Sequence, residues 1–498
     1  MNAVTQFDDV LDAVIVGAGI SGIAMAVHLN AECPGKRFAV LERRPELGGT
    51  WDLFRYPGIR SDSDMYTMSL ENEPWLERNT LGAGPSIKAY LGKVAQGHAL
   101  TGRILFEHHV ISADWHSDEG LWQLQVEVGG QRKTMRTRYL HLASGYYDYD
   151  SPYEAEIPGR ETFKGTIAHP QFWPENLDYA GKRVVVIGSG ATAVTLVPAM
   201  ADAVEHITML QRSPTWIQSM PQRNPVIRAI RAVLPKRTAH KAIRWLAIRM
   251  QKKMFKEARE KPDVVATRIL DGVKTALGDK FEPVHFTPSY KPWDQRLCFV
   301  PDNDLFEAMN AGKASVVTDT VKAIDATGIR LNSGQHLDAD IIVTATGLQL
   351  AVAGKIAVSR DGVPVQWNDL IFYKGCMLTG MPNFAMVIVY ANASATLRSE
   401  LVARYVCRVL NHMDAAGANV FTPTPPAGLE ASDESLLQLQ SGYLLRSLHL
   451  MPRNSPTRPW RLDHDYLVDR KELLGAPIDD GNLKFTRVDT RATVREAA

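Results

Sequence analysis

The chain has 498 residues, of which 45% are hydrophobic and 22% are charged. Its 56 basic and 55 acidic residues give a net charge of +1, so no global electrostatic field favours nucleic acid as a partner. The length allows two or three globular domains with sizeable cores. No apolar run is long enough for a helix that spans a membrane.

The start of the chain shows no export signal, and the cysteines are scattered. A strand begins almost at once, without the basic region and cleavage site of a signal peptide. Cys33, Cys298, Cys376 and Cys407 form no CxxC pair. This spacing argues against a zinc site, a disulfide framework and a redox dithiol. We therefore expect a cytoplasmic protein without a metal ion.

The first motif is a strand, a glycine-rich turn and a helix. An apolar run leads into GAGISG, with Gly17, Gly19 and Gly22, and then into a helical segment. These glycines permit a tight turn, close approach of a pyrophosphate and close packing of helix on strand. The next strand, 38–41, ends in Glu42, whose carboxylate would accept hydrogen bonds from ribose hydroxyls. An acid there disfavours a phosphorylated ribose, so the unit indicates FAD or NAD.

Two glycine-containing stretches and two acidic residues follow this unit. GGTW, with Gly49, Thr50 and Trp51, and then RYPG predict a loop beside the phosphates. Asp62 follows RYPG by four residues, and Asp64 is its near neighbour. From the residues alone, either carboxylate is a solvated loop residue or a helix cap.

Between residues 163 and 174 the chain has the spacing FxGxxxHxxxWP. This stretch follows a β-meander, which the alternation of apolar and polar residues predicts over 105–142. Five positions of the twelve are specified, so a chance match is far rarer than for a glycine motif alone. The specified residues are Phe163, Gly165, His169, Trp173 and Pro174.

The strand, turn and helix unit then occurs a second time. RVVVI leads into GSGATA, with Gly188, Gly190, Thr192 and Ala193, but the following strand ends in Arg212 where the first unit has an acid. A guanidinium pairs with a ribose 2′-phosphate in a bidentate way, so this unit predicts NADPH in preference to NADH. The alternative is that this arginine is a solvated turn residue. Hydroxyl groups that would add contacts follow it, at Ser213 and Thr215.

A basic helical stretch follows, from 226 to 261, with apolar residues such as Trp245 among the cations. We expect a helical insertion at about 222–290 in the second nucleotide-binding domain. In the simpler interpretation its basic face is solvated. In the other interpretation it associates with an anionic membrane surface.

These motifs together resemble those of the Baeyer-Villiger monooxygenases. FxGxxxHxxxWP is similar to the fingerprint of that family, and GGTW, RYPG, LQRSPT and WDQRLC extend the resemblance over nearly the whole chain, towards the branch that includes the ethionamide-activating monooxygenase. The resemblance implies an α/β fold with two Rossmann-like dinucleotide-binding domains, FAD at the first site and NADPH at the second. It also implies that O2 is used to convert ketones to esters or lactones, with sulfoxidation of thioethers as a side activity.

The same resemblance implies roles for single residues. Asp62 corresponds to an active-site Asp, and Arg296 in WDQRLC corresponds to the catalytic Arg with which it pairs. A fixed cation beside an oxygenating flavin stabilises the negative charge that develops on oxygen, and arginine stays protonated. Gln295 stands where many members have a Lys that helps to hold NADPH, which leaves the strength of NADP discrimination open. His169 is expected either to couple cofactor binding to domain movement or to be a core histidine.

We therefore expect residues 1–147 and 351–498 to form the FAD-binding domain, and 148–350 to form the NADPH-binding domain. One alternative is a flavin-containing monooxygenase that oxidises nitrogen or sulfur, which shares both nucleotide sites but lacks the Asp and Arg pair and the full fingerprint. Another is a non-enzymatic flavin-binding redox sensor, which need not place a cation over the flavin. A disulfide reductase would need a reactive cysteine pair, which is missing here.

Overall fold

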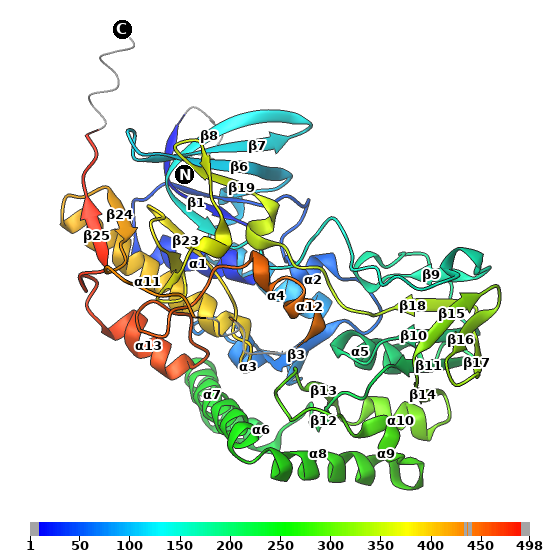
Figure 1. The fold of residues 1–498 in the computed structure, drawn as a ribbon. Coiled ribbons are helices and arrows are strands. Elements are labelled where there is room, and N and C mark those ends of the chain that lie inside the picture. Colours follow the sequence, from blue (N-terminus) through cyan, green and yellow to red (C-terminus); the bar gives the residue numbers. More distant parts are fainter. Residues whose placement is uncertain (1–8, 433–435, 437–440, 490–498) are drawn as a thin grey trace.

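Two β-sheets organise the chain, and the computed structural model describes residues 9–432, 436 and 441–489 of it (Figure 1). In the larger sheet, β1 (Val10–Val16) lies between β2 (Phe38–Leu41) and β8 (Gln131–Leu142) and runs parallel to both. β6, β7 and β8 pair antiparallel in sequence order, which confirms the predicted meander. The other strands of this sheet are β5 (Ile104–Leu105), β6 (His108–His116), β7 (Leu121–Val128), β19 (Ala357–Arg360), β20 (Val363–Pro364) and β23 (Phe384–Met386).

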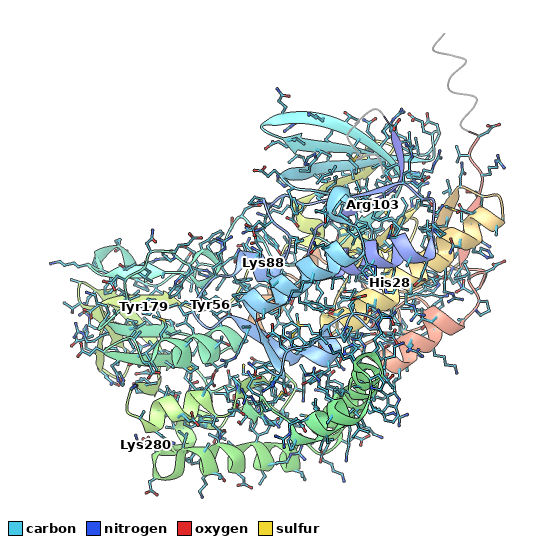
Figure 2. All side chains as sticks on the ribbon, turned by 180° about the vertical axis from the view of Figure 1, so that it is seen from behind. His28, Tyr56, Lys88, Arg103, Tyr179 and Lys280 are labelled. Atoms are coloured by element: carbon cyan, nitrogen blue, oxygen red, sulfur yellow. The ribbon has the colours of Figure 1, made fainter. Side chains whose placement is uncertain are left out.

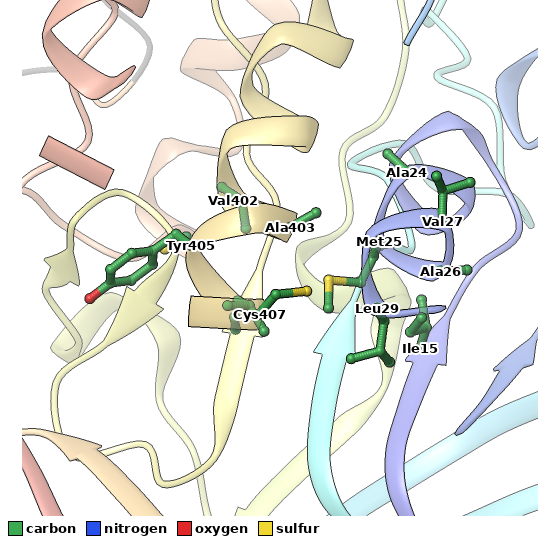
Figure 3. Close-up of a cluster of buried hydrophobic side chains, with 14 of the residues drawn as sticks. Ile15, Ala24, Met25, Ala26, Val27, Leu29, Val402, Ala403, Tyr405 and Cys407 are labelled. Carbon is green, nitrogen blue, oxygen red and sulfur yellow. The ribbon is translucent and has the colours of Figure 1, made fainter. Parts of the chain in front are cut away.

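Helices from the two ends of the chain cover the larger sheet. α1 (Ile20–Glu32) packs against α11 (Ala395–Ala415), and Met25 points towards Cys407 across this contact (Figure 3). Apolar residues of these two helices pack together in one core, so the C-terminal part of the chain completes the first nucleotide unit. We call the larger sheet with its helices the larger body, and the smaller sheet with its surrounding elements the smaller body. The other helices of the larger body are α2 (Thr50–Leu53), α3 (Met65–Met68), α4 (Gly84–Gly97), α12 (Gly442–Leu445) and α13 (Tyr466–Gly475).

The smaller sheet has five parallel strands in the order β14-β11-β10-β18-β9. Its central strands are almost continuous runs of buried β-branched and aliphatic residues, as expected for a parallel sheet that is covered on both faces. The strands are β9 (Thr166–Ala168), β10 (Arg183–Ile187), β11 (His206–Gln211), β14 (Ala314–Thr318) and β18 (Ile341–Thr344). The elements around it are α5 (Ala191–Met200), α10 (Asp304–Asn310), β15 (Val321–Asp325), β16 (Gly328–Leu331) and β17 (His336–Asp338).

Small two-stranded sheets complete the fold. β3 (Arg60–Asp64) pairs with β4 (Leu81–Ala83), and β12 (Ile217–Met220) pairs with β13 (Cys298–Pro301). Each of these sheets lies near the junction of the two bodies. The remaining pairs are β21 (Phe372–Tyr373) with β22 (Met377–Leu378), and β24 (Val420–Pro423) with β25 (Leu483–Thr486).

The helical insertion lies along one side of both bodies (Figure 1). It comprises α6 (Pro225–Val233), α7 (Lys236–Glu260), α8 (Pro262–Leu277) and α9 (Pro283–Phe286). α7 packs on α3 of the larger body, whereas α8 packs on β12 and α10 beside the smaller sheet. The predicted fold class, an α/β protein with two dinucleotide-binding units and a helical insertion, is confirmed. Among the described residues, no helix combines the length and the apolar character that crossing a membrane requires.

Candidate functional site

A cavity of about 880 Å³ lies where the carboxyl ends of the central strands of the two sheets meet. Ligands of open α/β sheets bind at this position, because the loops that follow the strands gather there. Gly22 and Ala193 pack beneath the turns instead of lining the cavity. The predicted residues that line it are Gly17, Gly19, Glu42, Gly49, Thr50, Trp51, Asp62, Gly188, Gly190, Thr192, Arg212, Ser213, Gln295 and Arg296.

In the first glycine-rich turn, Gly17 is required for steric reasons, and Gly19 approaches a second glycine. Gly17 has a φ of 104°, and a Cβ atom there would lie 2.5 Å from the carbonyl oxygen of Ala143. A Cβ atom on Gly19 would lie 3.5 Å from the Cα atom of Gly49, so two glycine backbones converge at this point. Backbone N–H groups at the start of α1 can therefore approach a pyrophosphate closely, which is the geometry that a dinucleotide requires.

Glu42 is buried at the end of β2, with 5% of its surface exposed. One carboxylate oxygen accepts a hydrogen bond from the Ala18 N–H at 2.8 Å, and the other accepts one from the Arg44 N–H at 2.9 Å. Burial raises the pKa of Glu42, although these two N–H groups and the charge of Arg44 oppose the shift. Each oxygen keeps lone pairs for a ribose hydroxyl, so this residue fits the role predicted for it.

The GGTW loop is anchored by a carboxylate that the sequence did not single out. Asp52 is buried in α2 directly after Trp51, and it accepts hydrogen bonds from Arg44 at 2.5 Å and from Lys88 of α4 at 2.6 Å. Burial alone would raise the pKa of Asp52, but the two cations outweigh it and hold that pKa below its usual range. Lys88 is labelled on α4 in Figure 2. No local motif marks this residue, because its partners come from other elements.

Asp62 and Arg296 meet in the cavity, 234 residues apart in the chain. Nη1 of the arginine lies 3.3 Å from Oδ2 of the aspartate, and about one third of each side chain is exposed. Asp64 points away, because it caps α3 by accepting hydrogen bonds from the N–H groups of Tyr66 and Thr67. The cavity is therefore lined by Asp62 and not by Asp64.

The second glycine-rich turn has the same backbone geometry as the first, but the strand that follows it leads to an arginine instead of an acid. Gly188 has a φ of 137°, and a Cβ atom there would lie 2.3 Å from the carbonyl oxygen of Ala345. Arg212 follows β11 and is exposed at the cavity. The hydroxyl of Ser189 donates to the Ser213 carbonyl at 3.2 Å and lies 2.9 Å from that of Thr215. An open cation beside two hydroxyl side chains fits a phosphorylated ribose.

The fingerprint residues lie outside the cavity, on β9 and the turns that flank it. Position 165 requires glycine for a steric reason, because a Cβ atom there would lie 2.2 Å from the carbonyl oxygen of Asp340. Phe163 and Trp173 pack against two different cores of the smaller body, and Pro174 is exposed. β9 pairs with β18 at the edge of the smaller sheet, and the contacts of Phe163, Gly165 and Trp173 secure the segments on either side of it.

His169 and Gln295 occupy contrasting places. The histidine is buried at the start of the turn after β9, where its Nδ1 accepts a hydrogen bond from the Gln171 N–H at 3.1 Å. Burial lowers its pKa, so the neutral ring is favoured. Gln295 lines the cavity beside Arg296, and its neutral amide offers no charge to a phosphate.

The RYPG loop connects the two units, a role that its sequence did not reveal. Tyr56 is buried with a hydrogen bond to Thr192 at the start of α5, and burial raises its pKa to about 12. It lies where the two bodies meet (Figure 2). A Cβ atom on Gly58, whose φ is 76°, would lie 2.5 Å from that of Ala199 in α5. The only signal in the sequence was the Pro-Gly pair, which marks a turn but does not show what the turn touches.

Neither a metal centre nor a cysteine pair accompanies the cavity in the described part of the chain. No group of three His, Cys, Asp or Glu residues there could hold a metal ion. Cys33, Cys298, Cys376 and Cys407 are buried thiols, and of these Cys298 lines the cavity. A single thiol cannot perform dithiol and disulfide exchange.

Comparison with known proteins gives relatives over almost the whole chain. Residues 14–281 match the family described as pyridine nucleotide-disulphide oxidoreductase. The chain is 46% identical to FAD-containing monooxygenase EthA of Mycobacterium tuberculosis, over 96% of this chain and 98% of that protein. It is 45% identical to the probable FAD-binding monooxygenase AlmA of Acinetobacter baylyi, over 96% of each.

Solved structures share the fold at lower identity. A steroid monooxygenase bound to NADP matches with a TM-score of 0.77 and 21% identity, covering 96% of this chain and 100% of that one. A cyclohexanone monooxygenase with bound ε-caprolactone matches with a TM-score of 0.74 and 21% identity, covering 96% and 100%. These values show that the overall fold is shared.

Proposed function

The chain belongs to the FAD-containing monooxygenases, and on that premise we propose that it carries out the Baeyer-Villiger reaction, in which one oxygen atom of O2 is inserted beside a ketone carbonyl. It is an oxidoreductase that uses FAD and NADPH. The observation that carries the proposal is the pair of Asp62 and Arg296, 3.3 Å apart in the cavity between the nucleotide units. We expect alkyl and aryl ketones of moderate length as substrates and esters or lactones as products.

The two units divide the cofactors between them in this proposal. FAD would lie on the turn of Gly17 and Gly19, with Glu42 accepting hydrogen bonds from its ribose. NADPH would lie on the turn of Gly188 and Gly190, with its 2′-phosphate at Arg212.

Arg296 would supply the positive charge that the reaction requires. FAD, when bound, accepts a hydride from NADPH and activates O2. The guanidinium stabilises negative charge that develops on oxygen during attack on the carbonyl. Asp62 fixes the direction of the guanidinium through a charge-assisted hydrogen bond. Since both side chains are about one third exposed, the substrate can reach them.

Replacing Arg296 tests the proposal. We expect Arg296→Ala to retain FAD and to be reduced by NADPH at close to the wild-type rate, because the arginine lies outside both glycine-rich turns. Ester formation should fall by roughly 10²–10³-fold, the usual effect of removing one group that stabilises an oxyanion. The matched control is Arg132→Ala, an exposed arginine on the hairpin of β7 and β8. Ester formation by Arg296→Ala at the wild-type rate would refute the role of the arginine.

Product analysis separates the proposal from its nearest alternative. A flavin-containing monooxygenase that oxidises nitrogen or sulfur would convert a thioether to a sulfoxide but leave a ketone unchanged. We propose sulfoxidation as a side activity, because a soft sulfur atom needs no cation to be oxidised. Mass spectrometry of products from one ketone and one thioether should therefore show both an ester and a sulfoxide in the wild type. In Arg296→Ala the ester should be lost to a greater extent than the sulfoxide.

We also propose that the outward face of α7 binds an anionic lipid surface. Trp245, Leu246 and Met250 are 52%, 42% and 56% exposed, and they share that face with Arg249 and Lys253. The Arg249 guanidinium lies 4.0 Å from the Trp245 ring centroid. Exposed apolar side chains interleaved with cations are typical of helices that lie in a membrane interface. Charge complementarity favours anionic headgroups as the partner.

Not all cations of the insertion are available for this surface. Arg244 is buried against α3, Arg231 donates to backbone carbonyls at Trp75 and Glu77, and Lys252 pairs with Asp465. Exposed cations remain on α6, at Arg228, and on α7, at Lys236, Arg237, Lys241, Arg249, Lys253 and Lys256.

Co-sedimentation with vesicles tests the lipid surface. The wild type should pellet with phosphatidylglycerol vesicles, which are anionic, and not with pure phosphatidylcholine vesicles, which carry no net charge. Binding should be strongest at low salt, because the Debye length shortens as salt rises. The double variant Trp245→Ala/Arg249→Ala should lose binding. Lys322→Ala/Lys484→Ala, which alters exposed lysines elsewhere, should retain it. Equal binding by the two variants would contradict the proposal.

We propose the cytoplasm as the compartment. NADPH is available there, and a reducing environment suits four buried free thiols.

A further inference from the structure

Asp62 is presented on an irregular segment between two paired residues. β3 pairs with β4 at Arg60 opposite Ala83 and at Asp64 opposite Leu81, and the register shifts between these two points. The residues between them therefore bulge out of the ladder, and Asp62 is at the centre of the bulge. Bulges of this kind aim a side chain and are common beside active sites. The position of Asp62 thus depends on what holds its two flanking residues.

The first flanking residue is held by the smaller body. Arg60 donates to Asp304 of α10 at 2.7 Å and to the Val194 carbonyl of α5 at 3.4 Å. Its side chain is 12% exposed. This end of the bulge is therefore fastened to the smaller body, whose contacting residues lie on both sides of Arg296 in the sequence.

The second flanking residue is held by the helical insertion. Gln251 of α7 donates through Nε2 to Oδ2 of Asp64 at 2.6 Å and to the Thr67 hydroxyl at 3.2 Å. Asp64 also accepts hydrogen bonds from the N–H groups of Tyr66 and Thr67, at 3.1 and 2.9 Å, through its other oxygen. The side-chain amide thus completes the cap of α3 from a different part of the chain. Without it, Oδ2 would keep only the Thr67 hydroxyl as donor.

Arg244, two turns earlier on the same face of α7, holds the far end of α3. Its guanidinium donates to the carbonyl oxygens of Tyr66 and Thr67 at 3.2 Å each, and to Glu400 of α11 at 2.5 Å. Because α3 has only four residues, it has little stability of its own. The inward face of α7 therefore fixes the short helix that follows Asp62.

We propose that Gln251 is a positioning residue for the pair of Asp62 and Arg296, acting through the cap of Asp64 on α3. The inference rests on the proposed function, because it concerns the direction in which Asp62 presents its carboxylate to the guanidinium. It adds a role for the insertion: α7 crosses to the larger body and sets the geometry of a residue there.

Hydrogen exchange of the holoenzyme gives a readout that does not depend on turnover. In Gln251→Leu, amide protection over 60–68 should fall by about tenfold, the usual effect of losing a hydrogen bond to a charged group. Protection of α11 should stay unchanged. The matched control is Gln131→Leu, an exposed glutamine on the β7 and β8 hairpin. Equal protection over 60–68 in the two variants would overturn the proposal.

A charge-switch variant distinguishes positioning from a general loss of stability. In Gln251→Glu, a protonated carboxyl can donate to Asp64 at low pH, whereas two carboxylates repel each other once both ionise. The charged group that faces them is Arg244, which is itself held by Glu400. Protection over 60–68 in Gln251→Glu should therefore approach that of the wild type at low pH and decline as pH rises, relative to Gln251→Leu at each pH. If the ratio of amide protection over 60–68 between Gln251→Glu and Gln251→Leu does not change with pH, the proposal is overturned.

The yield of ester per NADPH oxidised supplies the functional readout. In Gln251→Leu this yield should fall several-fold, while FAD content and the rate of flavin reduction stay at wild-type values, because neither nucleotide turn contacts the glutamine. An unchanged yield despite lost protection would overturn the positioning role. If the wild type forms no ester, the proposed function fails, but the hydrogen-exchange results still decide whether Gln251 holds the segment.

Discussion

The two nucleotide units share the same strand, turn and helix backbone, but they differ in how tightly the turn packs on its helix and in whether the terminal side chain is already held in place. In both, the first glycine has a positive φ and lies against the carbonyl group of the residue that follows a neighbouring strand. A Cβ atom on Gly17 would lie 2.5 Å from the Ala143 oxygen, and one on Gly188 would lie 2.3 Å from the Ala345 oxygen. The third position differs. A Cβ atom on Gly22 would lie 1.8 Å from the Gly17 oxygen, whereas the second unit has Ala193 at the equivalent place. Helix α1 therefore lies closer to its turn than α5 does.

The residue at the end of the second strand shows the same contrast. Glu42 is buried and already accepts two backbone hydrogen bonds, so its carboxylate is fixed before any ligand arrives. Arg212 is exposed at the cavity. A preorganised site suits a cofactor that stays bound, and an open cation suits one that enters and leaves in each cycle. This contrast between the two units supports the proposal that FAD occupies the first site and NADPH the second.

The strongest challenge to this comparison is to place a methyl group at the third position of the first unit. Gly22→Ala should prevent correct packing of α1 on β1, because the new Cβ atom cannot avoid the Gly17 oxygen. We expect overpacking to cost about 3 kcal/mol or more and to yield protein without FAD. Flavin absorbance per mole of purified protein is the measurement. The counterpart in the second unit, Ala193→Gly, should keep its FAD and lose only about 1 kcal/mol of stability, as usual for glycine in a helix. Normal FAD content in Gly22→Ala would show that the two turns are equivalent.

The second challenge concerns the cation at the open site. Arg212→Gln should raise the Kd for NADPH by about ten- to a hundredfold, because a charge-assisted pair with the 2′-phosphate is lost. The Kd for NADH, which lacks this phosphate, should hardly change. Ser213→Ala should have a smaller effect than Arg212→Gln, since one neutral hydrogen bond is removed. Fluorescence titration of the oxidised enzyme with both nucleotides measures these constants. Parallel losses for NADPH and NADH would place the phosphate elsewhere.

The sequence predicted the parts of the site that depend on local pattern. Strand, turn and helix lie within a few residues of one another in each unit, so the glycines and the terminal residues Glu42 and Arg212 reveal the nucleotide units directly. The resemblance to a known family added Asp62 and Arg296, whose 234-residue separation no local pattern could bridge. The geometry brings those two side chains together, while their catalytic roles remain a proposal.

The contacts that position the site were not predictable, because they join segments far apart in the chain. Gln251 meets Asp64 across 187 residues, Arg244 meets Glu400 across 156, and Arg60 meets Asp304 across 244. Arg244 counted as one cation of a basic helix in the sequence, but it is buried. Periodicity shows which residues share a helix face, and it does not show which element covers that face.

The smallest expected effect concerns the pH dependence of Glu42. Because burial raises its pKa above the ordinary 4.5, the folded protein holds this proton more tightly than the unfolded chain does. Its contribution to stability is therefore fully present below pH 4.5 and is lost as pH rises through the raised pKa. Glu42→Gln cannot titrate, so the Tm of the wild-type apoprotein minus that of the variant should decrease with rising pH, by no more than about 4 °C. Added FAD should shrink this slope, because ribose hydroxyls that donate to the carboxylate favour its ionised form. A slope that is the same with and without FAD would mean that the ribose does not reach Glu42, and the comparison of a preorganised acid with an open cation would lose its basis.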